Sequence, residues 1–192
     1  MIYFLRHGLD DERFIGGWSH MGLTWEGRRQ VKKTLSFLKE HPIHFDRIYT
    51  SDLPRALETA QMVQREFEVP IIEDERLREL NKGDLNGIYI VKANLKYHYG
   101  EFLQNMTVDT KYPNGESFRD FWERMASTLP YFLEQDDTLI VTHRGVINYL
   151  YYQMNGMFMD GIPTDTNKEQ FNVTHASIHE YQPKTKQIQK IY

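Results

Sequence analysis

Short apolar runs alternate along the chain with longer segments in which apolar residues recur every three or four positions. The short runs are typical of buried strands, and the periodic segments predict amphipathic helices. Strands are expected at 1–5, 45–50, 71–72 and 138–142, and helices at 24–38, 53–67, 118–132 and 146–154. Pro130 is expected to bend or interrupt the third helix. Strands and helices that alternate in this order favour an α/β fold.

The C-terminal segment has a different pattern. Apolar and polar residues alternate around Ile178 and Glu180, turn residues follow at 183–186, and apolar residues return from Ile188 to Tyr192. This pattern predicts an antiparallel hairpin at the edge of the sheet. The complete prediction is a three-layer α/β/α sandwich whose central sheet is mostly parallel, with an antiparallel edge strand.

Length and composition narrow the class of protein. A chain of 192 residues is expected to form one domain, 1–192, and a net charge of -4 gives no electrostatic case for nucleic acid or a membrane surface. No apolar run approaches the ~20 residues of a membrane helix. Arg6 interrupts the N-terminal apolar run too early for a secretory signal, so a cytoplasmic protein is expected. Without cysteine, thiolate nucleophiles, thiolate zinc sites and disulfides are excluded.

Three of the predicted strands end in charged or imidazole side chains. The pairs Arg6-His7 and His143-Arg144 follow two strands directly, and the segment 51–55 brings Arg55 after a third. The ends of parallel strands gather at one edge of an α/β sheet, where sites form. Two imidazoles alone fit a metal as well as a phosphate, but the guanidinium forks match phosphate oxygens and oppose a metal cation. A phosphate pocket is therefore the better interpretation.

Five motifs in register carry a resemblance to a known family. The segments are Leu5-Arg6-His7-Gly8, 51–60, 77–80 with 83–87, Gly115-Glu116-Ser117 and Val141-Thr142-His143. Together they resemble the motifs of the histidine phosphatase superfamily, the phosphoglycerate-mutase-like group, across nearly the whole chain. A single Arg-His-Gly is a weak signal, whereas five motifs in the same order are a specific one.

The resemblance implies a role for each motif residue. His7 would accept the phosphoryl group as a phosphohistidine, while Arg6, Arg55 and His143 would hold its non-bridging oxygens. Glu79 would protonate the leaving oxygen and then activate water. The resemblance implies no metal and no cofactor, and a small phosphate ester as the partner.

The chain departs from the family pattern at two places. The segment 9–12 is short and lacks the Asn that ordinarily helps to hold phosphate, and either Arg13 or a backbone amide around Gly16-Gly17 would take its place. Arg144 stands where the family commonly has a small residue. It would either contact an acidic substrate or form a surface ion pair. His98 and His175 are left without a role.

The function expected first is a metal-independent phosphatase that acts on small organic phosphomonoesters. Two alternatives stay open: a phosphoglycerate mutase, and a non-catalytic phospholigand-binding protein on the same fold. Glu79 is followed by Leu80-Asn81-Lys82 instead of the Glu-Arg-His-Tyr run of mutases, which favours hydrolysis. The aromatic segment 88–112 is either a lid over the leaving group or plain packing. Neither the substrate nor the oligomeric state can be predicted.

Overall fold

The computed structural model describes residues 1–159, 162–163 and 171–192, and within them a central sheet has the strand order β3-β2-β4-β1-β7-β8. The parallel strands are β1 (Ile2–Arg6), β2 (Arg47–Thr50), β3 (Ile71–Glu73) and β4 (Thr138–Thr142). The antiparallel strands are β7 (Ile178–Gln182) and β8 (Gln187–Lys190). The mostly parallel sheet with an antiparallel edge is thus confirmed, and the predicted hairpin supplies two strands of that edge.

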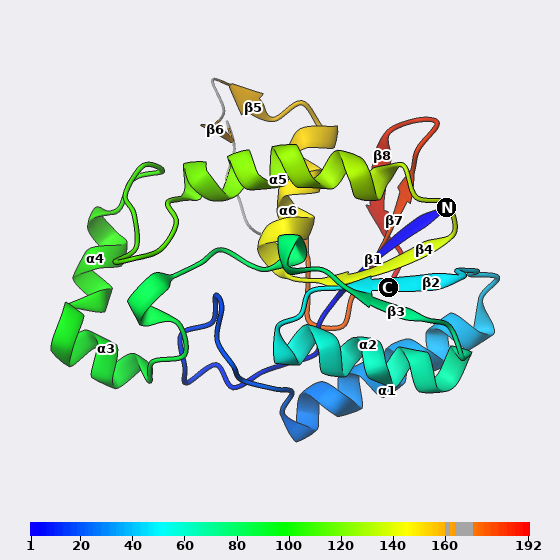
Figure 1. The fold of residues 1–192 in the computed structure, drawn as a ribbon, viewed down its shortest axis with the longest axis horizontal. Coiled ribbons are helices and arrows are strands. Elements are labelled where there is room, and N and C mark those ends of the chain that lie inside the picture. Colours follow the sequence, from blue (N-terminus) through cyan, green and yellow to red (C-terminus); the bar gives the residue numbers. More distant parts are fainter. Residues whose placement is uncertain (160–161, 164–170) are drawn as a thin grey trace.

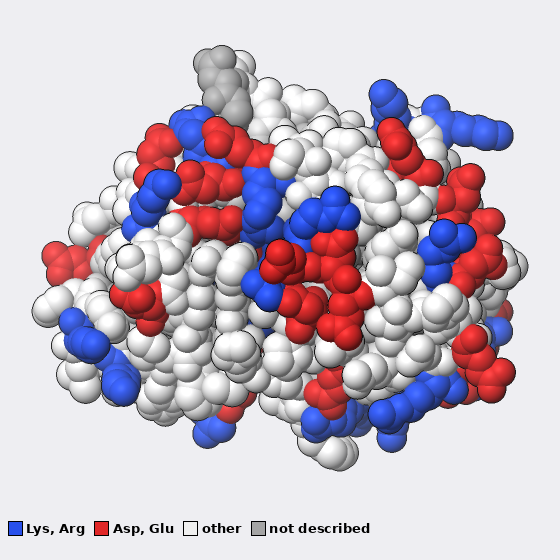
Figure 2. All heavy atoms as spheres, viewed as in Figure 1, with Lys and Arg blue, Asp and Glu red and all other residues white. Residues whose placement is uncertain are grey.

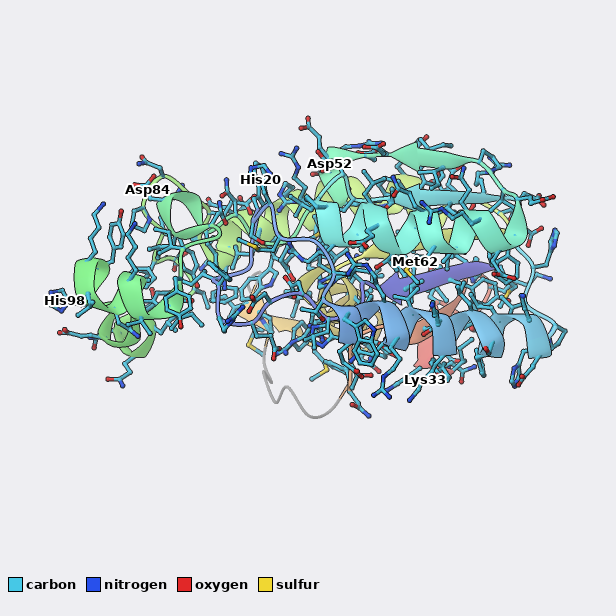
Figure 3. The ribbon with its side chains drawn as sticks, turned by 90° about the horizontal axis from the view of Figure 1, so that it is seen from below. His20, Lys33, Asp52, Met62, Asp84 and His98 are labelled. Atoms are coloured by element: carbon cyan, nitrogen blue, oxygen red, sulfur yellow. The ribbon has the colours of Figure 1, made fainter. Side chains whose placement is uncertain are left out.

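Helices cover both faces of the sheet (Figure 1). On one face lie α1 (Trp25–Glu40) and α2 (Pro54–Phe67), which Figure 3 shows side by side. On the other face lie α5 (Phe118–Leu133) and α6 (Arg144–Met154). Successive residues of a strand point to opposite faces, so Leu5 packs in the core beneath α1 and α2, whereas Phe4 packs in the core beneath α5 and α6. The predicted three-layer α/β/α sandwich is confirmed.

The segment after β3 extends the molecule beyond the end at which β1 enters its loop (Figure 1). It contains the short 3₁₀ helices η1 (Glu75–Leu77) and η2 (Gly83–Leu85), then α3 (Ile90–Tyr97) and α4 (Tyr99–Asn105). His98 joins α3 to α4 with a left-handed backbone (φ 49°) and lies at the outer end of this pair (Figure 3). A separate two-stranded sheet of β5 (Phe158–Met159) and β6 (Ile162–Pro163) was not predicted.

The helix boundaries follow from local chemistry. The side chain of Thr24 caps α1 by accepting from the backbone N–H of Gly27, as its sequence position indicates. The expected interruption at Pro130 does not occur, because α5 continues to Leu133. Pro130 lies in the last turn, so its missing N–H removes one backbone hydrogen bond, to the carbonyl of Ala126, and leaves the preceding turns intact.

Acidic and basic side chains are interspersed on the molecular surface. Figure 2 shows them side by side over α5 and η1, where Arg76 pairs with Asp74 and Arg124 with Glu116. Mixed charge of this kind gives no single-sign field over that face. Among the described helices, none has the length and apolar character needed to cross a bilayer.

Candidate active site

A cavity of about 740 Å³ opens at the edge of the sheet where β1, β2 and β4 end. Its lining includes most of the predicted site residues, namely Arg6, His7, Arg55, Glu79 and Arg144. His143 lies directly behind this lining, fully buried, with its ring centroid 5.1 Å from that of His7. Four segments therefore meet at this cavity, as the ends of the strands predict. They are the loop after β1, the start of α2, the loop between η1 and η2, and the start of α6.

His7, which lines the cavity, is held with one ring nitrogen unprotonated. Its Nδ1 lies 2.7 Å from the carbonyl oxygen of Gly8, and a carbonyl only accepts, so Nδ1 carries the hydrogen and donates it. Nε2 is left with a lone pair, toward which Arg55 Nε donates at 3.1 Å. Burial, followed by the neighbouring charges of Arg55, His143 and Arg6, holds the pKa of His7 well below its usual range. The ring is therefore neutral at neutral pH.

Arg55 is a buried cation in the first turn of α2, with only 2% of its surface exposed. One terminal nitrogen donates to Ser19 Oγ at 3.2 Å, and the other donates to the carbonyl oxygen of Gly17 at 2.7 Å. These bonds leave Nε directed at His7. Gly17 is at positive φ (69°), and a side chain there would collide with the carbonyl oxygen of Leu80, so the turn that receives Arg55 requires glycine.

Two buried nitrogens beside His7 have no hydrogen-bond partner among the described residues: Arg6 Nε and His143 Nδ1. The other nitrogens of Arg6 reach the carbonyl oxygen of Val173 at 2.8 Å and His175 Nε2 at 2.6 Å, and His143 Nε2 lies 2.9 Å from Ser51 Oγ. Arg6 Nε is a donor, and His143 Nδ1 is one when Ser51 Oγ–H donates to Nε2. A buried donor without an acceptor is unfavourable, so the two nitrogens then fit a ligand that is rich in acceptor oxygens. A phosphoryl group has that chemistry.

Both carboxylate oxygens of Glu79 are held by backbone amides. Oε1 accepts from Leu80 N–H and Oε2 from Gly145 N–H, each at 3.0 Å. A Cβ at position 145 would lie 2.1 Å from Oε1, so any side chain there would displace the carboxylate from this position. On the backbone side, Arg124 donates to the carbonyl oxygens of Glu79 and Arg78 at 3.0 and 3.1 Å. Glu79 is thus fixed from two elements at the rim of the cavity.

The structure does not bring Arg13 to the cavity. Its side chain is 72% exposed and pairs with Asp11, whereas Gly16 and Gly17 line the cavity. Arg144 does line the cavity, and its side chain is exposed. The pKa of Arg6 is lowered by burial and, to a lesser extent, by the positive charge of Arg144.

Sequence reasoning missed three residues of this site. Asp10 lines the cavity beside Arg55, and Arg124 secures the backbone of Glu79. His175 bonds Arg6, and its ring centroid lies 5.7 Å from that of His7. The segment that carries His175 has no strand or helix pattern, so no sequence signal places it.

Buried histidines make the stability of the fold depend on pH. His179 is fully buried between Tyr151 Oη and Ser177 Oγ, and burial above all lowers its pKa to about 3. The unfolded chain binds a proton near the usual pKa of about 6.5, whereas the folded chain does not, so stability falls as the pH drops from about 6.5 toward 3. For His179 alone we expect a loss of about 2 kcal/mol between pH 7 and pH 5.

Urea unfolding at both pH values measures this loss. In His179→Gln, which keeps a donor and an acceptor, the pH-dependent part of the unfolding free energy should shrink by about 2 kcal/mol. His20→Gln is the matched control, because His20 lies on the outer side of the loop after β1 (Figure 3). The same pH dependence in His179→Gln and in the unmodified protein would contradict the prediction.

Comparison with known proteins agrees with this geometry. The family model described as histidine phosphatase superfamily (branch 1) matches residues 2–191. The chain belongs to the histidine phosphatase superfamily. This membership confirms the resemblance that the five motifs indicate.

Relatives within the superfamily have two kinds of names. The chain is 30% identical, over 81% of its length and 82% of the relative's, to the 2,3-bisphosphoglycerate-dependent phosphoglycerate mutase of Bartonella henselae. Among solved structures, it resembles Bacillus stearothermophilus YhfR (27% identity, TM-score 0.73, 94% and 91% of the two chains). It also has the fold of a putative alpha-ribazole-5'-P phosphatase from Escherichia coli (22% identity, TM-score 0.76, 98% and 93% covered). Mutases and phosphatases both move phosphoryl groups, so this histidine phosphatase homologue is a phosphoryl-transfer enzyme.

Proposed function

We propose that this protein is a metal-independent phosphatase that hydrolyses small organic phosphomonoesters through a phosphohistidine at His7. The observation that carries the proposal is the unprotonated Nε2 of a buried, neutral His7, whose tautomer is fixed by the hydrogen bond from Nδ1 to Gly8. The unpartnered nitrogens of Arg6 and His143 lie beside it. A nucleophile and oxygen-seeking donors therefore share one pocket.

The reaction has two displacements. In the first, Nε2 of His7 forms a bond to phosphorus as the ester P–O bond breaks, and Glu79 as the carboxylic acid gives its proton to the leaving oxygen. In the second, the Glu79 carboxylate takes a proton from water as the water oxygen attacks phosphorus and the P–N bond breaks. Arg6, Arg55 and His143 hold the non-bridging oxygens in both steps and offset their charge.

The charges around His7 favour a phosphate over a metal ion. His7, Asp10 and His175 lie close enough together to bind a cation, which is the strongest argument for a metal in this cavity. However, a guanidinium nitrogen lies 3.1 Å from a ring nitrogen of His7, and another lies 2.6 Å from one of His175. These fixed positive charges oppose a divalent cation and attract a dianion.

The outer wall of the cavity supports a leaving group with apolar surface. Segment 88–112 and α5 supply this wall, which contains Tyr99, Leu103, Met106, Tyr112, Phe118 and Trp122. Tyr99 and Tyr112 are also buried in the core, so packing and substrate contact are combined in one segment. We place Arg144 at the mouth as the contact for a negative charge on the leaving group.

A phosphate-release assay tests hydrolysis against the mutase alternative, which the names of the sequence relatives favour. We expect the purified protein to release inorganic phosphate from phenyl phosphate without any acceptor. A mutase would retain its phosphohistidine until phosphoglycerate is added. Transfer to phosphoglycerate with negligible release would replace the phosphatase proposal, and absence of both reactions would favour a phospholigand-binding protein.

The same assay tests Arg144 with a pair of esters. The ratio of kcat/KM for para-carboxyphenyl phosphate to that for phenyl phosphate should fall by about tenfold in Arg144→Ala, because one charge-assisted contact is lost. An unchanged ratio would contradict a contact between Arg144 and the leaving group.

A further inference from the structure

The carboxylate of Asp10 lines the same cavity as the cationic side chains of Arg6 and Arg55. Asp10 follows Gly8 by two residues, lines the cavity, and is only 15% exposed. Its Oδ2 lies 3.5 Å from Arg55 Nε, and its carboxylate is within 4.8 Å of a ring nitrogen of His7 and of His175. A negative charge is unexpected beside the place that a phosphate dianion would occupy.

Asp10 is not needed to orient Arg55. The guanidinium is already fixed by Ser19 Oγ, the Gly17 carbonyl oxygen and His7 Nε2, all within hydrogen-bond distance. The distance of 3.5 Å to Asp10 is longer than an ordinary charge-assisted hydrogen bond. The interaction of Asp10 with this pocket is therefore mainly one of charge.

Asp10 competes with a bound phosphate for one donor. A phosphate oxygen that reaches Arg55 Nε accepts from it at about 2.8 Å, in place of the longer contact of 3.1 Å to His7 Nε2. That oxygen and Asp10 Oδ2 are then two anions at the same N–H. Arg6, Arg55 and His175 face them, and Glu79 adds a further negative charge at the rim.

We propose that Asp10 weakens the binding of inorganic phosphate and thereby speeds release of this product. The inference rests on the proposed hydrolysis, because a hydrolase must release inorganic phosphate in every cycle, whereas transfer to an acceptor does not require it. In the absence of Asp10, a buried pocket with two arginines would hold its own product tightly.

Titration calorimetry with inorganic phosphate at fixed pH and salt tests this inference. Asp10→Asn keeps the size of the side chain and removes the charge, and its Kd for phosphate should be lower by about tenfold. Asp11→Asn is the matched control, because Asp11 pairs with Arg13 outside the cavity, and its Kd should stay within about twofold of the unmodified protein. Asp10→Ser provides a second neutral variant should the first fail to fold.

An unchanged or higher Kd in folded Asp10 variants would overturn the inference. Calorimetry needs no turnover, so its result can be separated from that of the hydrolysis assay. Hydrolysis with an unchanged Kd would refute only the role of Asp10. Tighter phosphate binding in a protein that releases no phosphate from esters would refute the hydrolytic function and leave the competition at Arg55 in place. If no protein in the set binds phosphate, the inference about Asp10 falls, and the hydrolysis assay alone decides the proposed function.

Discussion

Replacement of His7 by alanine is expected to lower kcat for a phosphomonoester by about four orders of magnitude or more. No other described side chain that lines the cavity offers a neutral ring nitrogen whose tautomer is fixed by a backbone carbonyl. The ring of His175 lies 5.7 Å from that of His7, but His175 is not among the residues that line the cavity, and its Nε2 lies 2.6 Å from an Arg6 nitrogen. The loss should therefore be nearly complete.

Steady-state kinetics and samples quenched in base measure this prediction together. The unmodified protein should yield an acid-labile, base-stable phosphopeptide that contains His7, and His7→Ala should yield none. EDTA should leave the activity of the unmodified protein unchanged, since the charge at the site is supplied by arginines. His20→Ala is the control for loss of an exposed ring on the adjacent loop. Substantial turnover by folded His7→Ala would refute the covalent mechanism.

The residues of the site that the sequence places correctly are those that directly follow a strand. Arg6, His7 and His143 come immediately after apolar runs, and parallel pairing of β1 with β4 puts the ends of the two runs together. Arg55 follows from the same rule through β2 and the first turn of α2. The geometry of a parallel sheet therefore predicts the meeting of these four side chains without knowledge of the loops.

The loop after β1 is where sequence reasoning was weakest. An irregular segment has no period, so nothing in it determines which side chains point inward. Both Arg13 and Asp10 were available to a phosphate pocket, and the structure turns Arg13 to solvent and Asp10 to the cavity. His175 and Arg124 were missed for a related reason, since their roles depend on tertiary contacts with segments distant in sequence.

Glu79→Gln is expected to lower kcat/KM for an alkyl phosphate by about 10²- to 10⁴-fold, and much less for para-nitrophenyl phosphate. An alkoxide leaves poorly without a proton, whereas nitrophenolate leaves well without one. The term kcat/KM reports the steps through the first P–O cleavage, so it isolates this proton transfer from the later activation of water. Glu75→Gln, an exposed neighbour in η1, should change neither value.

The losses in kcat/KM for the two esters distinguish a missing proton donor from a displaced loop. Glutamine at position 79 would place an amide N–H₂ against one of the backbone N–H groups that now hold Glu79. A displaced loop would impair the two esters by the same factor, because both depend equally on the pocket of His7 and Arg55. Equal losses in kcat/KM would therefore assign Glu79 a structural role and require another proton donor. A loss confined to the alkyl ester would identify Glu79 as the group that protonates the leaving oxygen.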